Sequence, residues 1–151
     1  MEKISSFLVN HTKLKEGIYI SRIDGDIITY DLRAKKPNAG DYMSNIAMHS
    51  IEHLFATFIR NSSIGDKVIY FGPMGCQTGF YLLVRDLPSN AVVAKIKEIL
   101  NQIIDYRGEV PGNSELECGN YRMLNLEAAQ AECLAFYNNI VQLDDVLSYP
   151  V

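Results

Sequence analysis

Two pairs of strand-like segments restrict the fold more than any other feature of the sequence. All four segments are rich in β-branched and aromatic side chains, and polar or glycine-containing turns separate the members of each pair. The segments are residues 17–23, 27–32, 67–71 and 79–84. The first pair flanks Asp24-Gly25-Asp26, and an Asp-Gly step between such runs is a strong signal for a hairpin. The second pair flanks a turn predicted at Gly72-Pro73-Met74-Gly75.

Three other segments have the apolar spacing of helices that bury one face. They run from Ser44 or Asn45 to Arg60, from Leu87-Pro88-Ser89 to near Gly108, and from the cap residue Asn125 through Ile140. The order is strand, strand, helix, strand, strand, helix, helix. This order predicts an α+β two-layer sandwich, with helices packed on one face of a four-stranded antiparallel sheet. The last five residues, LSYPV, are too short for independent structure.

Length and charge restrict the class of protein. A chain of 151 residues is expected to form a single domain over residues 1–151. Fourteen basic and eighteen acidic residues leave a net charge of -4, which argues against a general binder of nucleic acid or anionic membranes. No run approaches the ~20 apolar residues of a membrane span. Three cysteines do not suggest a disulfide framework, so we expect a reducing cytoplasm.

The first predicted helix carries two histidines that suit a metal. His49 and His53 are four residues apart, so on a helix they point the same way. Glu52 borders the same face and completes H-x-x-E-H, the inverted zinc-peptidase motif, in which the glutamate moves protons rather than binding metal. The alternative is a pair of core histidines bonded to backbone, with Glu52 at the surface. The spacing favours the metal site.

The third ligand of such a site remains open among His11, a carboxylate and a cysteine. Cys133 lies on the apolar stripe of the last helix and is expected to be a core residue. Cys76 and Cys118 are candidates. If both bound, a closed structural Cys2His2 site would result, whereas one alone would leave an open position and a free thiol. The two stand 42 residues apart and form no C-x-x-C pair, which favours the open site without saying which cysteine binds.

Several stretches together resemble the S-ribosylhomocysteine lyase (LuxS) family, in the same order over essentially the whole chain. The matching stretches are Ser6-Phe7, His11, Asp31-Leu32-Arg33, Pro37-Asn38, His49 to Leu54, Gly72 to Tyr81, and Cys118-Gly119. P-M-G-C-Q-T-G combined with H-x-x-E-H is far more specific than either motif alone. The sequence departs from the pattern at Tyr70, where some members carry Asp, and at Asn10, where an acidic residue is common.

The resemblance implies an enzyme with one divalent metal per subunit, Fe(II) natively, with Zn or Co able to substitute. It implies a cytoplasmic homodimer with its two active sites at the subunit interface, and no membrane or nucleic-acid partner. The residues it assigns are His49, His53 and Cys118 to the metal, Cys76 and Glu52 to catalysis, and Ser6, His11, Arg33 and Arg60 to substrate binding. For Arg60, a solvated charge at a helix end is an equally good interpretation.

The reaction that the resemblance implies is cleavage of S-ribosyl-L-homocysteine to L-homocysteine and 4,5-dihydroxy-2,3-pentanedione, the precursor of the quorum-sensing signal autoinducer-2. A carbonyl migrates along the sugar before β-elimination of the sulfur. Each step removes a proton beside a carbonyl, which a Lewis-acidic metal eases and which needs a base and an acid. The rival hypotheses are an inverzincin-like metallopeptidase with a carboxylate as third ligand, and a non-enzymatic domain with a structural Cys2His2 zinc.

Overall fold

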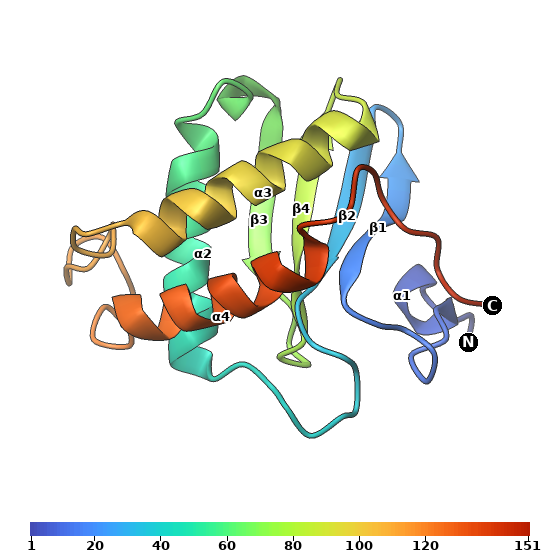
Figure 1. Cartoon of the computed structure of the whole chain (residues 1–151), viewed down its shortest axis with the longest axis horizontal. Helices are drawn as coiled ribbons and strands as arrows, with labels where there is room; N and C mark the ends of the chain where they lie inside the picture. The colour runs from blue at the N-terminus through green and yellow to red at the C-terminus, as the bar shows by residue number, and fades with distance from the viewer.

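The computed structural model describes residues 1–151 and contains one four-stranded antiparallel sheet. The strand order is β1-β2-β4-β3, so the two predicted hairpins lie side by side and join through β2 and β4 (Figure 1). The strands are β1 (Gly17–Asp24), β2 (Ile27–Arg33), β3 (Val68–Pro73) and β4 (Gly79–Arg85). Gly25 has a φ of 62°, a left-handed conformation that favours glycine in the turn between β1 and β2.

Three long helices form the second layer and cover one face of the sheet (Figure 1). They are α2 (Asn45–Arg60), α3 (Ser89–Asp105) and α4 (Leu126–Ile140). None of them combines the length and the apolar character that a membrane crossing requires. The predicted α+β two-layer sandwich is therefore confirmed. Two short elements, α1 (Ser5–Leu8) and the 3-10 helix η1 (Gly65–Lys67), were not expected from the sequence.

Side-chain caps explain where two of the helices begin. The Ser44 hydroxyl accepts a hydrogen bond from the Ala47 amide at the start of α2. Ser44 is thus the N-cap, and Asn45 is the first residue of the helix. The Asn125 side chain does the same for α4, accepting from the Ala128 amide. Each cap satisfies one amide that the first helical turn leaves without a partner.

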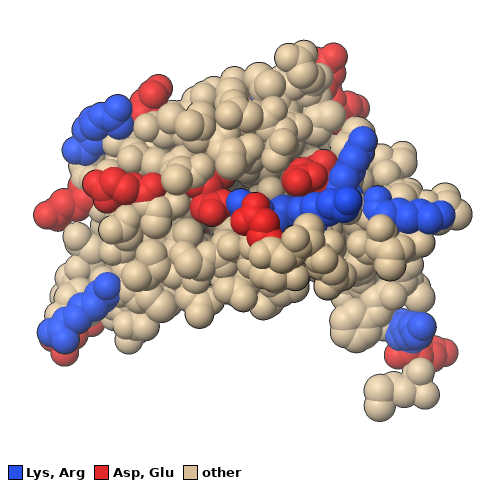
Figure 2. All heavy atoms as spheres, turned by 60° about the horizontal axis from the view of Figure 1, so that its bottom comes forward, with Lys and Arg blue, Asp and Glu red and all other residues tan.

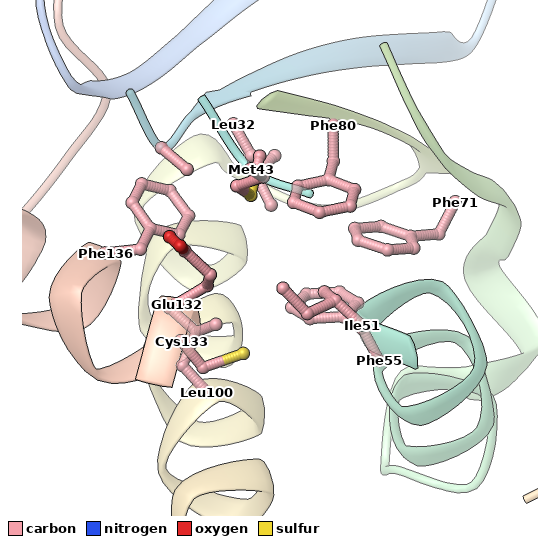
Figure 3. Close-up of a pocket in the computed structure, with 11 residues that line it drawn as sticks. Leu32, Met43, Ile51, Phe55, Phe71, Phe80, Leu100, Glu132, Cys133 and Phe136 are labelled. Carbon is pink, nitrogen blue, oxygen red and sulfur yellow. The ribbon is translucent and has the colours of Figure 1, made fainter. Parts of the chain in front are cut away.

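The core fills the space between the sheet and the helices. Phe71 lies between Phe55 and Phe80, with ring centroids 4.2 and 5.1 Å away, so α2, β3 and β4 share one aromatic stack. Figure 3 shows these rings around a void of about 10 Å³, whose walls are apolar except for Glu132 at the margin. Lys35 pairs with that carboxylate at 2.9 Å. A void of this size holds at most about one water, so it is a feature of core packing and not a ligand site.

The turn between β3 and β4 lies further along the chain than the sequence predicted. We expected a turn at residues 72–75 and Cys76 at the start of a strand, but β3 continues to Pro73 and β4 begins at Gly79. The Met74 amide donates to the Gly79 carbonyl, and Gln77 adopts a φ of 65°. The five-residue turn therefore includes Cys76, and its thiol is exposed.

The face of the sheet opposite the long helices is covered in part by the two ends of the chain. Side chains alternate along a strand, so Tyr30 and Leu32 enter the core while Asp31 and Arg33 point to this other face. The α1 segment borders a pocket there. The C-terminal tail also runs here, with the Leu147 amide donating to the Ile18 carbonyl. This tail is therefore anchored to the edge strand β1, which its length alone did not suggest.

Candidate active site

Three predicted metal ligands converge beside α2. His49 and His53 project from successive turns of the helix, and Cys118 reaches them from the long loop between α3 and α4. One ligand atom from each residue lies within 4.8 Å of the others, and the Cys118 sulfur is 3.4 Å from His49 Nε2. Tetrahedral zinc has ligands at ~2.0–2.3 Å, which places neighbouring ligand atoms ~3.3–3.8 Å apart. The spacing of this cluster therefore suits one metal ion.

The backbone of the same loop sets the tautomers of both histidines. Nδ1 of His49 lies 2.7 Å from the Met123 carbonyl, and Nδ1 of His53 lies 2.7 Å from the Pro111 carbonyl. A carbonyl only accepts, so both Nδ1 atoms carry the proton and both Nε2 atoms keep a free lone pair. Histidine ligands of metals commonly have their second nitrogen bonded in this way. The donor set and its tautomers thus fit a divalent metal.

Two further contacts hold the loop against the helix. Gly112 has a φ of 74°, and a Cβ atom placed on it would lie 3.0 Å from His53 Nδ1. The histidine therefore packs into space that a side chain at this position would occupy. The buried hydroxyl of Ser50 donates to the Ile46 carbonyl and accepts from the Asn125 amide. This bond joins α2 to the start of α4.

Glu52 lies next to His53 on α2 and is half-buried. Its carboxylate makes no hydrogen bond and no salt bridge within the chain. It is consequently free to exchange a proton with a bound molecule, unlike the paired carboxylates elsewhere in the protein.

A second group of predicted site residues lines a pocket of about 320 Å³ on the other side of the sheet. Ser6 comes from α1, His11 from the segment that follows, Arg33 from the end of β2, and Cys76 from the turn between β3 and β4. Nδ1 of His11 donates to the Val9 carbonyl at 2.9 Å, so its Nε2 is again the free nitrogen. The pocket thus presents a hydroxyl, an imidazole, a guanidinium and a thiol.

A buried ion pair fixes the guanidinium in this pocket. Arg33 and Asp31 are only 3% and 2% exposed, and they form a two-pronged pair with N–O distances of 3.1 and 2.7 Å. Burial alone would lower the pKa of Arg33, but the charge and hydrogen bonds of Asp31 outweigh it and the pKa is raised. Nη1 of Arg33 donates to the Thr78 hydroxyl at 2.8 Å and lies 3.9 Å from the Cys76 sulfur.

Known proteins match this chain over nearly its whole length. The family model of S-ribosylhomocysteinase (LuxS) matches residues 4–146. The chain belongs to this family. It is 44% identical to an S-ribosylhomocysteine lyase of Desulfotalea psychrophila and 45% identical to one of Clostridium acetobutylicum, each over 99% of both chains. It is 50% identical to the lyase of Finegoldia magna, over 92% of this chain and 88% of the relative.

Membership of the LuxS family agrees with the geometry and disfavours both rival hypotheses. No carboxylate completes the cluster, as an inverzincin-like peptidase would require, because the third residue is Cys118. Cys76 lies outside the cluster and lines the other pocket. A closed structural Cys2His2 site is therefore not what this chain forms.

The site residues of this LuxS chain fall into two groups that share no hydrogen bond, and no residue of the metal cluster lines the pocket around Cys76. The metal cluster and Glu52 belong to α2 and the loop after α3, whereas Cys76 and its neighbours line the pocket near α1. Arg60 is in neither group. It ends α2, about 16 Å along the helix from His49, and donates to the Ile69 carbonyl. That placement agrees with the interpretation of Arg60 as a helix-end charge.

Two polar residues of the second group were not singled out in the sequence. Asp31 and Thr78 are each 2% exposed, and both contact Arg33. Asp31 could have been found from the sequence, because it is an acidic residue within an apolar strand. It lies two positions from Arg33, and residues two apart in a strand point to the same face of the sheet. Thr78 offered no comparable signal, because its role depends on the turn that brings it under Cys76.

Charges on the surface are mixed where Figure 2 displays them. In a band across this face, acidic side chains gather at the left and centre and basic side chains at the right, and a broad uncharged area lies below the band. Lys35, for example, contacts both Asp41 and Glu132. Basic side chains of this surface thus have acidic partners in part.

Proposed function

We propose that this chain is an S-ribosylhomocysteine lyase, which converts S-ribosyl-L-homocysteine to L-homocysteine and 4,5-dihydroxy-2,3-pentanedione. The observation that carries the proposal is that Cys76 and Cys118 occupy different places in the structure. Cys118 completes a His2Cys cluster, while Cys76 stays free beside a buried arginine. The cluster can leave a fourth position open for substrate, and the free thiol can serve the proton transfers that the reaction needs.

The metal would be held by His49, His53 and Cys118, with Fe(II) as the native ion and Zn or Co as substitutes. A divalent ion there acts as a Lewis acid toward substrate oxygens. The histidine and thiolate ligand set suits any of these three ions, and availability in the cell often decides among them.

The chain's own residues supply the proton transfers. Two successive proton shifts move the sugar carbonyl from C1 to C3, and removal of the C4 proton then expels the homocysteine sulfur from C5. A thiolate at Cys76 would accept a hydrogen bond from the Thr78 hydroxyl, 3.0 Å away, and face the Arg33 guanidinium. Nearby cations favour the thiolate form. Glu52, which has no partner in the chain, would be the second proton carrier.

Substrate binding is assigned to the pocket around the thiol. Ser6, His11 and Arg33 line it and offer a hydroxyl, a free imidazole nitrogen and a cation to the hydroxyl groups of the ribose. In the mechanism, these residues hold the sugar so that its carbons face Cys76. We give Arg60 no contact with substrate in this scheme, because it lies in neither group.

The two separate groups support a homodimer. Neither group alone provides both a metal cluster and a thiol. A twofold dimer would place the pocket of one subunit against the cluster of its partner and complete two equivalent sites. We further propose that residues 1–151 form one lyase domain that works in the cytoplasm, where unpaired thiols persist.

Homocysteine release tests the proposed activity directly. Anaerobically purified protein loaded with Fe(II) or Co(II) is mixed with S-ribosylhomocysteine, and free thiol is measured over time. The intact protein is expected to release homocysteine. Cys76→Ala is expected to keep its metal and melting temperature but to turn over ~10²–10⁴-fold more slowly, whereas Cys133→Ala serves as the control for cysteine removal. No release from folded, metal-loaded protein would refute the lyase.

A further inference from the structure

The C-terminal tail brings one tyrosine to the buried ion pair behind the thiol pocket. The tail lies along β1, with a parallel bridge between Tyr19 and Leu147. Two residues further on, the ring of Tyr149 stacks on the ring of Tyr19, with centroids 4.8 Å apart and planes at 6°. Its hydroxyl donates to Asp31 Oδ2 at 2.7 Å. The tail thus reaches the site although 118 residues separate Tyr149 from Asp31.

Tyr149 is the only donor to the Asp31 carboxylate other than Arg33. Both oxygens of the carboxylate accept from the guanidinium, and Oδ2 accepts in addition from Tyr149. A buried carboxylate needs its lone pairs satisfied, and leaving one unpaired is costly. Burial, followed by the charge of Asp31, raises the pKa of Tyr149. The phenol therefore keeps its proton and remains a donor.

From Asp31 the contacts continue without a break to the thiol. Arg33 Nη1 donates to Thr78 Oγ1, so the Thr78 oxygen acts as acceptor there and its own proton is available to the Cys76 sulfur at 3.0 Å. When Cys76 is a thiolate, which has no proton to give, the Thr78 hydroxyl is the donor in this contact. A shift of the Asp31 carboxylate would change the position of the cation and of the hydroxyl that both face Cys76.

We propose that Tyr149 is a positioning residue of the lyase reaction. Its hydroxyl holds the Asp31 carboxylate, which in turn holds the Arg33 guanidinium against the Thr78 hydroxyl and the Cys76 sulfur. This role rests on the proposed function of Cys76. The other titratable groups facing this part of the site are Tyr19 and Tyr81, whose pKa values are raised by burial and then by Asp31, and His11, which lines the pocket.

The chain offers a matched pair of variants for the test. Tyr149→Phe removes the hydroxyl that reaches Asp31 but keeps the ring stacked on Tyr19. Tyr19→Phe removes the other hydroxyl of the same stack, which donates to the Lys15 carbonyl and has no bond to Asp31. Both changes delete one oxygen from the same stacked pair, and only Tyr149→Phe removes a hydrogen bond to Asp31.

The readout is the rate at which iodoacetamide alkylates Cys76 in metal-loaded protein at pH 7, followed by mass spectrometry alongside kcat/KM. Loss of a hydrogen bond to a charged group predicts a fall of about tenfold in both quantities for Tyr149→Phe. Tyr19→Phe should stay within about twofold of the wild type. Buried Cys133 should remain unmodified in all three proteins, which reports an intact fold.

Two results would overturn the proposal. One is an unchanged alkylation rate and kcat/KM in Tyr149→Phe. The other is an equal loss in both variants, which would mean that the tail acts only through ring packing. If the wild type released no homocysteine, the lyase function would fail, and the alkylation rates would still show whether Tyr149 positions the groups around Cys76.

Discussion

At the scale of the residue, identical side chains acquire different chemistry from their surroundings. The three cysteines show this most clearly: Cys76 is exposed in a turn, Cys118 is half-buried beside His49, and Cys133 is 1% exposed in the core. The three histidines instead share one arrangement, because each donates from Nδ1 to a backbone carbonyl. In each case the second nitrogen remains free for metal or substrate.

The buried thiol makes a prediction about stability and pH. Burial raises the pKa of Cys133 to about 12, from an ordinary value of 9.0. The folded state therefore keeps this thiol protonated, and its contribution to stability is full below pH 9 and is lost as the pH rises toward 12. The free energy of unfolding should fall by up to about 1.4 kcal/mol per pH unit from this group.

Urea unfolding of the wild type and of Cys133→Ala between pH 7 and pH 10 measures this effect. The variant should be about 1–2 kcal/mol less stable at pH 7, because it leaves a small cavity. Between pH 9 and 10 its stability should decline less steeply than that of the wild type. Buried tyrosines ionise at higher pH than Cys133 begins to, and they do so equally in both proteins. Parallel profiles would show that Cys133 does not titrate in this way.

At the scale of the element, α2 combines two roles on two faces. Its apolar face packs in the core through residues such as Ile51, Leu54 and Phe55. The face with His49 and His53 meets the loop after α3, whose carbonyls and Cys118 complete the cluster. A rigid helix therefore supplies two ligands with fixed spacing, and a loop supplies the third.

The contact between His53 and the loop predicts the effect of a substitution at Gly112. Gly112→Ala places a methyl group 3.0 Å from His53 Nδ1 at a positive φ. The histidine must move, so we expect the affinity for Co(II) to fall about 10–100-fold in competition with a chelator.

Gly40→Ala is the matched control for that substitution. Gly40 has a φ of 82°, but a Cβ atom there would meet nothing within 4 Å. It should cost a comparable amount of backbone strain and leave Co(II) affinity unchanged. Equal affinities in the two variants would show that the loop does not position His53.

The long elements were predictable from sequence because their signals are local. Hairpins and helices follow from apolar periodicity, turn residues and caps such as Asn125. The four-residue helix α1 is too short to show a period. The tail gains its place only from contacts with β1 and Asp31, which no local pattern encodes.

The candidate site was predictable only in part for the same reason. The spacing of His49 and His53 pointed to a metal, but it did not distinguish Cys118 from Cys76. Which cysteine binds the metal depends on where the long loop after α3 lies. The assignment of Cys118 came from the family resemblance. Tyr149 was not predicted because its partner Asp31 is distant in sequence. Thr78 was not predicted because its contact with Arg33 depends on the conformation of the turn before β4.

At the scale of the whole molecule, the sheet separates two incomplete sites. The metal cluster and Glu52 lie with the helix layer, and the thiol pocket lies with α1 and the opposite face. In the proposed mechanism, one chain carries both groups of residues but does not bring them together. The proposed homodimer would let a second copy of the chain supply the missing group for each site.

Mixing two inactive variants tests this arrangement most directly. Cys76→Ala removes the thiol from the pocket, and Glu52→Gln removes the carboxylate beside the metal cluster. The homodimer of either variant should therefore retain about 1% of wild-type homocysteine release or less. After equal amounts are unfolded together and refolded with Co(II), half of the dimers are mixed and each carries one intact site. The account predicts about a quarter of wild-type activity. A mixture no more active than its components would contradict a site shared between two subunits.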